Sequence, residues 1–173
     1  MSYFANINIQ CSDETDLSAV CYYPKSLKAA VLIGPATGIK KTFYHSFAEH
    51  LAANGFGVIC YDNRGIASSL IGSIKSNSKI NLFDWGQLDM TAVLDRLMNE
   101  FPNTTYHVIG HSAGGQLVGL MKNAVALKSM FNFACSSGSI RKMNYPFKMA
   151  AIFFLNYFIP ISNFLLVIQS LSG

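Results

Sequence analysis

Short apolar runs alternate with helical patterns along this chain, and this alternation restricts the fold more than any other feature. Four such runs are expected to be strands, the first three of them buried: residues 29–33, 56–61, 106–109 and 131–135. An apolar run without polar alternation is typical of a strand covered on both faces. Segments with helical spacing lie between them: residues 44–54, 84–99 and 114–128. The chain is therefore predicted to form an α/β fold, a mostly parallel sheet with flanking helices.

The amino-terminal part is expected to add a hairpin to this sheet. Residues 7–10 and 17–23 have strand character, and the acidic turn at residues 12–16 joins them. The chain has 173 residues, of which 51% are hydrophobic and only 13% are charged. That is enough for one domain with a real core and argues against disorder. We expect residues 1–140 to form the α/β core.

Three loops rich in glycine or polar residues follow predicted strands. They are the segments 34–38 (GPATG), 62–65 (DNRG) and 110–114 (GHSAG). Functional residues of parallel sheets collect at the carboxyl ends of the strands. The three loops are therefore expected to share one edge of the sheet.

The last of these loops has the pattern G-x-S-x-G between a predicted strand and a small-residue helix. In this context the pattern predicts a sharp strand-to-helix turn that raises Ser112 above the sheet edge. Gly110 and Gly114 are needed there because side chains would collide with the neighbouring strand and helix. The N–H of Ala113 would point toward an oxyanion that develops at the helix N-terminus. The alternative is a structural glycine turn.

Four segments together resemble the α/β-hydrolase superfamily, in particular its serine-aminopeptidase-like and esterase-like members. They are GPATG at 34–38, ICYDNRGIASS at 59–69, FDWGQLDMTAVLDRL at 83–97 and GHSAGG at 110–115. The resemblance covers about residues 5–140. The chain departs from the family pattern at Gly34, where a His is usual, and at residues 66–67, where His-Gly is usual.

The resemblance implies a serine hydrolase that cleaves ester or amide bonds of a small-molecule acyl substrate. Ser112 would be the nucleophile, and the backbone N–H groups of Ala36 and Ala113 would form the oxyanion hole. It implies no cofactor and no metal. The family's order of catalytic residues is Ser, then Asp or Glu, then His. A missing Asp–His pair would therefore have oriented and deprotonated Ser112.

The chain after Ser112 contains no Asp, Glu or His, so it cannot supply that pair. Upstream, His111 adjoins the serine, but consecutive side chains should diverge at such a turn. His45 is the main candidate for a surrogate base, whereas His107 is expected to have a structural role on its strand. Two further expectations are structural. Asp62 and Arg64 should hold their loop by a salt bridge and hydrogen bonds, and Asp84 and Asp89 should favour a helix start.

The sequence ending is interpreted as that of a fold whose last strands are missing, through a premature stop or frame shift near residue 165. A genuine short variant is the alternative. Residues 141–173 form an apolar segment that resembles the family's helical cap. Residues 149–168 are also long enough to cross a bilayer, with Lys142 and Lys148 on one side, although Pro160 interrupts the run. Both interpretations stay open, with the cap favoured.

Other classes of function fit less well. The four cysteines form no CxxC or Cys/His cluster, so a zinc site is not expected. No secretory signal is visible, which predicts a cytoplasmic protein, with membrane association possible through residues 149–168. Basic residues form no run, which argues against nucleic-acid binding. A nucleotide site is not supported because no G-x-G-x-x-G follows the first parallel strand. The competing hypothesis is a non-catalytic remnant or a membrane-associated binding protein.

Overall fold

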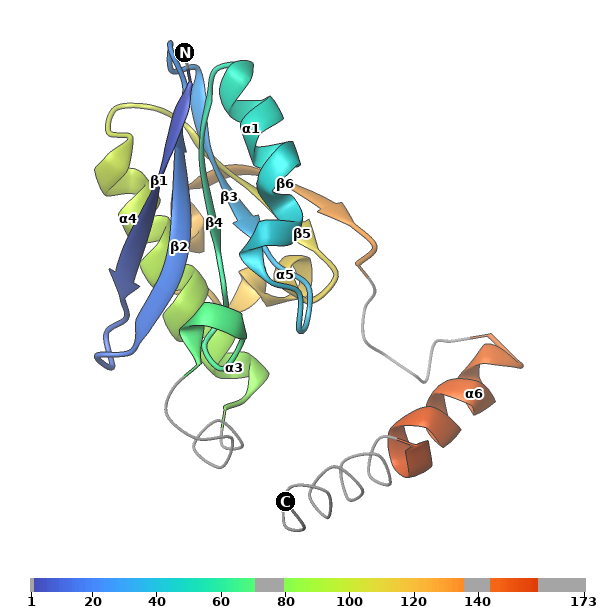
Figure 1. Cartoon of the computed structure of the whole chain (residues 1–173). Coiled ribbons are helices and arrows are strands. Elements are labelled where there is room, and N and C mark those ends of the chain that lie inside the picture. Colours follow the sequence, from blue (N-terminus) through green and yellow to red (C-terminus); the bar gives the residue numbers. More distant parts are fainter. Residues whose placement is uncertain (1, 71–79, 136–143, 159–173) are drawn as a thin grey trace. The chain divides into compact units, whose positions relative to one another are not determined.

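A computed structural model of the chain describes residues 2–70, 80–135 and 144–158. The described residues belong to two compact units, residues 1–135 and residues 136–173. The first unit is a six-stranded sheet with helices on both faces (Figure 1). The predicted α/β fold is therefore confirmed.

The sheet combines an antiparallel hairpin with four parallel strands. Its strand order is β1-β2-β4-β3-β5-β6. The hairpin consists of β1 (Tyr3–Gln10) and β2 (Asp16–Tyr23), and β2 pairs antiparallel with β4 (Phe56–Tyr61). The parallel strands β3 (Ala29–Gly34), β5 (Tyr106–His111) and β6 (Leu127–Phe133) follow in that order. The carboxyl ends of β3, β4 and β5 therefore lie at one edge, as the sequence predicts.

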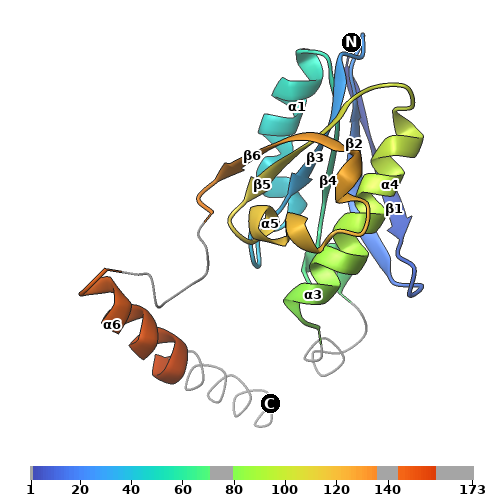
Figure 2. The ribbon, with the colours of Figure 1, turned by 180° about the vertical axis from the view of Figure 1, so that it is seen from behind.

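Helices cover the two faces of this sheet (Figures 1 and 2). The short helix η1 (Lys41–Tyr44) and α1 (His45–Ala53) pack on one face, where Tyr44, Ala48 and Ala52 join the core. The opposite face carries a continuous helical stretch that includes a π-helical part. Its successive parts are α3 (Leu82–Asp84), η3 (Trp85–Met90) and α4 (Thr91–Glu100). A further short turn, η2 (Ala67–Ser69), follows β4.

The segment after β5 differs from the single helix expected at residues 114–128. It consists of α5 (Ala113–Gln116), η4 (Leu117–Leu120) and η5 (Ala124–Ala126). Gly114, Gly115 and Gly119 lower the helix propensity of this segment, which accounts for its short turns. Strand β6 consequently begins at Leu127 rather than at residue 131 and ends at Phe133. The strand β1 likewise starts earlier than expected, at Tyr3 rather than at residue 7.

Strand β6 is exposed, unlike the other parallel strands. The five residues from Lys128 to Asn132 are all exposed. Met130 and Phe131 are 50% and 65% exposed, and successive side chains of a strand point to opposite faces. Neither face of β6 is therefore fully covered by the part of the chain that the structure describes. Parallel strands are normally buried on both faces, so β6 differs from the usual pattern.

The second unit contains a helical segment rich in aromatic residues. It comprises α6 (Phe147–Phe153) and η7 (Phe154–Phe158). Phe147, Phe153 and Tyr157 are exposed, and the rings of Phe153 and Tyr157 stack with centroids 5.5 Å apart. No helix among the described residues is long and apolar enough to cross a membrane. Residues 159–168 of the candidate membrane run, and Pro160 with them, lie outside the described residues.

Candidate active site

Ser112 lies on a strained turn between β5 and α5. Its backbone angles are φ 49° and ψ −114°, which is a left-handed φ that side chains other than glycine seldom adopt. The N–H of Ser112 donates to the carbonyl of Phe133, at 3.1 Å, so the end of β6 supports the turn. Strain of this kind persists only where surrounding contacts impose it, and it clusters at functional sites. Ser112 thus lies on a kink between a strand and a helix, as the sequence predicts.

Close backbone packing explains the small residues around Ser112. A Cβ atom added to Gly114 would overlap the carbonyl of Gly34, and one added to Gly110 would overlap the backbone of Gly115. The contact between Gly34 and Gly114 brings the end of β3 against the start of α5. The loop that follows β3 and the turn that carries Ser112 are therefore neighbours at one edge of the sheet.

The two amides expected to form the oxyanion hole differ in their hydrogen bonding. Ala113 is the first residue of α5, a position whose N–H has no partner within its own helix. The N–H of Ala36, by contrast, donates to the hydroxyl of Tyr44 at 3.0 Å, and this bond is buried. Burial raises the pKa of Tyr44, so its hydroxyl keeps its proton near neutral pH. The sequence interpretation of Ala36 did not foresee this partner.

His111 is fixed by the same tyrosine. Its Nδ1 lies 2.9 Å from the Tyr44 hydroxyl, and its ring stacks on Phe133 with centroids 4.4 Å apart. The ring of Phe43 is stacked near that of His111, with 6.3 Å between their centroids. The side chain of His111 is thus engaged with these aromatic residues, in agreement with the expectation that it diverges from Ser112.

The other two histidines considered from the sequence also have partners of their own. His45, the candidate surrogate base, has its Nδ1 2.9 Å from the hydroxyl of Tyr22 and its Nε2 3.5 Å from Glu49. His107 contacts Ser129, with 2.7 Å between Nδ1 and Oγ, near the start of β5. The structure places neither histidine in hydrogen-bond contact with Ser112.

The predicted salt bridge between Asp62 and Arg64 is wrong. Asp62 pairs instead with Lys41, whose Nζ lies 2.7 Å from Oδ2 and whose backbone N–H donates to Oδ1 at 2.6 Å. Both side chains are buried, at 1% and 8% exposed. This pair ties the start of η1 to the end of β4, on the same edge of the sheet as Ser112. The sequence around Lys41 contains no pattern that predicts its pairing with Asp62.

Arg64 binds two other carboxylates. Its Nε lies 2.6 Å from Oδ1 of Asp89, and its Nη1 lies 2.6 Å from Oδ2 of Asp13. The backbone N–H of Arg64 also donates to Asp89, at 2.8 Å. Asp89 is fully buried, and this burial raises its pKa to about 6 even though Arg64 opposes the shift. Asp89 therefore has a structural role, although through Arg64 rather than as a helix-start charge.

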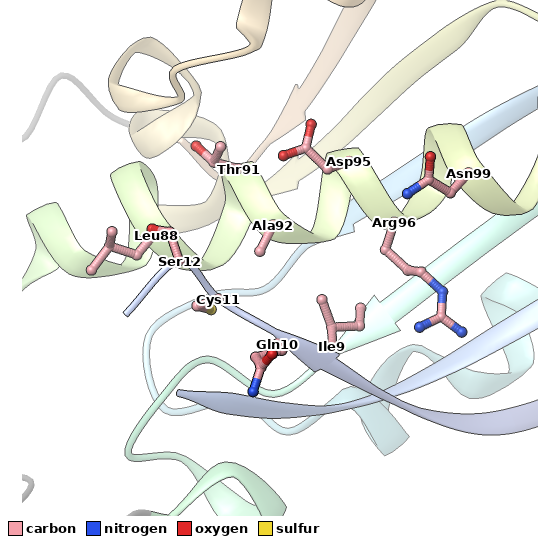
Figure 3. Close-up of a pocket in the computed structure, with 10 residues that line it drawn as sticks. All are labelled: Ile9, Gln10, Cys11, Ser12, Leu88, Thr91, Ala92, Asp95, Arg96 and Asn99. Carbon is pink, nitrogen blue, oxygen red and sulfur yellow. The ribbon is translucent and has the colours of Figure 1, made fainter. Parts of the chain in front are cut away.

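A cavity of about 380 Å³ lies between β1 and α4 (Figure 3). Its lining comprises Ile9, Gln10, Cys11, Ser12, Leu88, Thr91, Ala92, Asp95, Arg96 and Asn99. Arg96 extends from α4 toward β1, where it donates to the carbonyl of Asn8 at 3.2 Å and pairs with Glu100 (Figure 3). The cavity includes none of the residues expected at the active site. Among the described residues, no cluster of three His, Cys, Asp or Glu is placed to hold a metal.

A second hollow, of about 350 Å³, adjoins the loop after β3. Its lining comprises Gly38, Ile39, Lys40, Thr42 and Phe43. Phe43, which lines this hollow, also stacks near the ring of His111. His111 is the residue immediately before Ser112. A mostly apolar surface thus lies next to the predicted oxyanion loop.

Known proteins resemble this chain in sequence and in fold. A family sequence profile described as serine aminopeptidase, S33 matches residues 25–164. No curated protein sequence matches the chain. Among solved structures, a thermostable carboxyl esterase from Bacillus coagulans superposes with a TM-score of 0.64 at 17% identity, over 75% of this chain and 43% of the esterase.

Two further structures agree in fold. An α/β serine hydrolase without a lid from Xanthomonas campestris has a TM-score of 0.63 at 16% identity, over 83% of this chain and 65% of that protein. A protein described as a putative α/β hydrolase from a Nostoc species has a TM-score of 0.64 at 19% identity, over 88% and 50%. This chain therefore spans roughly half the length of the structures it resembles.

Proposed function

We propose, from the premise that the chain belongs to the serine aminopeptidase S33 family of α/β hydrolases, that Ser112 is the nucleophile of a site for ester or amide bonds. The observation that carries this proposal is the backbone of Ser112, with φ 49° and ψ −114° between β5 and α5. In that turn the serine is followed by the first amide of α5, which has no partner within its own helix, at the edge where the parallel strands end.

The proposed chemistry is acyl transfer. The Oγ of Ser112 attacks the carbonyl carbon of the substrate, and the carbonyl oxygen becomes an oxyanion. When this tetrahedral intermediate collapses, the ester or amide bond breaks and the alcohol or amine leaves with the proton that the serine has lost. Water then hydrolyses the acyl-serine to the acid and restores the hydroxyl. The N–H groups of Ala113 and Ala36 stabilise that oxyanion, on the helix N-terminal side and the β3 loop side respectively. The apolar hollow beside Phe43 is the proposed contact surface for an acyl chain. No metal or cofactor takes part in this step.

The proton of Ser112 needs an acceptor, and this requirement limits turnover. Residues 113–173 include no Asp, Glu or His. Upstream, His111 and His45 are hydrogen-bonded to Tyr44 and Tyr22 rather than to Ser112. Without a base, a serine hydroxyl is a poor nucleophile near neutral pH. We therefore expect slow chemistry at Ser112 from these 173 residues, supported by oxyanion stabilisation alone.

Hydrolysis of p-nitrophenyl acetate by the full chain tests the proposal. The expected result is a release of p-nitrophenol that exceeds the rate of buffer and of the Ser112→Ala variant. Ser69→Ala serves as a matched control, because Ser69 is a buried serine that donates to the carbonyl of Asp62. Equal rates for the wild type and Ser112→Ala, with both proteins folded, would refute a hydrolytic role for Ser112.

A non-catalytic binding protein is the second candidate, and the lack of acidic residues and histidine after Ser112 favours it. In that case the kinked turn is retained as architecture and the apolar surfaces serve for binding. Association with a membrane through residues 149–168 belongs to this second proposal. Flotation of the chain with phosphatidylcholine vesicles, combined with no Ser112-dependent hydrolysis, would support it over the first.

A further inference from the structure

The hydroxyl of Tyr44 joins two parts of the site that the sequence treats as separate. It accepts a hydrogen bond from the Ala36 N–H, at 3.0 Å, on the loop after β3. It also lies 2.9 Å from Nδ1 of His111, the residue immediately before Ser112. One side chain on η1 therefore contacts both the oxyanion loop and the end of β5.

We propose that Tyr44 is a positioning residue that holds the Ala36 N–H away from the oxyanion position in the resting site. The amide is released when an acyl group reacts at Ser112. This inference rests on the proposed function of Ser112 and adds a residue that sets the reactivity of that serine.

The amide proton of Ala36 is already used in a hydrogen bond. A backbone N–H has one proton to donate, and that of Ala36 is directed at the oxygen of Tyr44. For Ala36 to stabilise an oxyanion, this hydrogen bond must break or be shared. The energy of the oxyanion contact is therefore reduced by that of the bond given up. The amide of Ala113 gives up no bond within its own helix, since it is the first residue of α5.

Burial shields the hydrogen bond between Tyr44 and Ala36 from water. Tyr44 is 3% exposed and Ala36 is 7% exposed, so water does not readily replace the tyrosine oxygen. A buried N–H without an acceptor is costly, and removal of the hydroxyl would leave the Ala36 amide in that state. Such an amide gains more from binding an oxyanion than one that already has a partner. Removal of the hydroxyl should therefore favour the reaction at Ser112.

The ring of Tyr44 is held independently of its hydroxyl. It packs edge-on against Phe43 and His111, with centroids 5.1 Å and 6.0 Å away, and it belongs to the core beneath α1. Tyr44→Phe keeps these ring contacts and removes only the two hydrogen bonds. The fold should therefore tolerate the substitution.

Tyr22 supplies a matched control. Its hydroxyl lies 2.9 Å from Nδ1 of His45, the same pairing at the same distance as that of Tyr44 with His111. Tyr22 belongs to the same core cluster, and no backbone amide donates to its hydroxyl among the contacts that the structure describes. Tyr22→Phe thus removes an equivalent tyrosine–histidine contact without releasing an amide.

The experiment measures the rate at which a fluorophosphonate labels Ser112 in the full chain, for the wild type, Tyr44→Phe and Tyr22→Phe. We expect Tyr44→Phe to label about fivefold faster, on the order of one neutral hydrogen bond, while Tyr22→Phe matches the wild type. A residue with only a structural role would lower stability and would leave the labelling rate unchanged or reduced. An unchanged or lower rate for Tyr44→Phe would overturn the inference.

Nuclear magnetic resonance of the Ala36 amide keeps this test separate from the test of the proposed function. We expect faster hydrogen exchange of that amide in Tyr44→Phe and no change in Tyr22→Phe. If the wild type and Ser112→Ala label equally, the proposed function fails. The inference is then decided by this measurement, and an Ala36 amide insensitive to Tyr44→Phe overturns it.

Discussion

Arg64 is a buried cation that pairs with two carboxylates. Its side chain is 6% exposed and bridges Asp89, which is fully buried, and Asp13, which is 37% exposed. A charge at this depth is tolerated only when its hydrogen bonds are satisfied. The bridge joins the loop after β4 to η3 and to the turn of the hairpin. It therefore fixes one of the loops at the edge that carries Ser112.

Loss of the buried carboxylate should cost much more than loss of the exposed one. We expect Asp89→Ala to lower the free energy of unfolding by about 3 kcal/mol, because Arg64 then lies buried with one partner fewer. Asp13→Ala should cost less than about 1 kcal/mol, since its pair with Arg64 is solvent-screened. Urea denaturation of both variants measures these costs. Equal losses would contradict the burial assigned to Asp89.

The raised pKa of Asp89 makes stability depend on pH. Burial raises that pKa to about 6 from an ordinary value of 3.8, so the folded protein binds this proton more tightly than the unfolded chain. Stability from this group is therefore greatest below the unfolded pKa and is lost as pH rises toward 6. Between pH 7 and pH 5, the wild type should gain about 1 kcal/mol relative to Asp89→Asn. Denaturation curves at the two pH values check this difference, and a gain of opposite sign would refute it.

Single residues differ in how readily their surroundings can be predicted. The flanking glycines and the strand before Ser112 carry a local pattern, and that pattern correctly placed Ser112 on a kinked turn. The bond between Tyr44 and Ala36 depends on how η1 folds back over β3, which no local pattern shows. For the same reason the sequence suggests Arg64 as the partner of Asp62, whereas in the structure the partner is Lys41. Charge pairing within a loop is a weaker guide than the partner that burial provides.

At the scale of elements, the turn between β5 and α5 depends on the contact of Gly114 with Gly34. A methyl group at Gly114 would overlap the carbonyl of Gly34, so backbone atoms of β3 or α5 must move. We expect Gly114→Ala to destabilise the protein by at least about 2 kcal/mol and to slow labelling of Ser112. Thermal unfolding measures the first effect.

Gly119 offers the control for this substitution. It lies in the same helical segment, and a Cβ atom there meets nothing within 4 Å. Gly119→Ala should leave stability within about 0.5 kcal/mol of the wild type or raise it, because alanine reduces the freedom of the unfolded chain. A similar loss in both alanine variants would show that the contact between Gly114 and Gly34 is not what limits the turn.

The elements with continuous apolar runs were the ones that the sequence could place. Strands β3 and β4 match their predicted positions to within one residue. The segment after Ser112 was predicted less well, because its three glycines interrupt a helical spacing that Leu117 and Met121 otherwise suggest. Strand β6 carries Lys128 and Asn132 among its exposed residues, so its pattern is not that of a buried strand.

At the scale of the whole molecule, no residue of β6 is buried by the part of the chain that the structure describes. The chain spans roughly half the length of the hydrolases it resembles. We expect Phe131→Thr to change the free energy of unfolding by less than about 0.5 kcal/mol, since Phe131 is 65% exposed. Val108→Ala, in the fully buried centre of β5, should cost about 2 kcal/mol.

Urea denaturation and binding of a hydrophobic dye measure these effects together. Dye binding should fall in Phe131→Thr, because one large apolar side chain has been removed from an exposed surface. A loss of stability in Phe131→Thr as large as that in Val108→Ala would mean that another segment covers β6 in solution.

We propose that the hydroxyl of Ser112 is a nucleophile, slow without a base, at the edge of the sheet where the parallel strands end. Peptide mass spectrometry of the full chain after treatment with a fluorophosphonate tests it most directly. We expect one phosphonyl group on the peptide that contains Ser112, and none after Ser112→Ala. Modification spread over other residues, or no modification of Ser112 in the folded wild type, would contradict it.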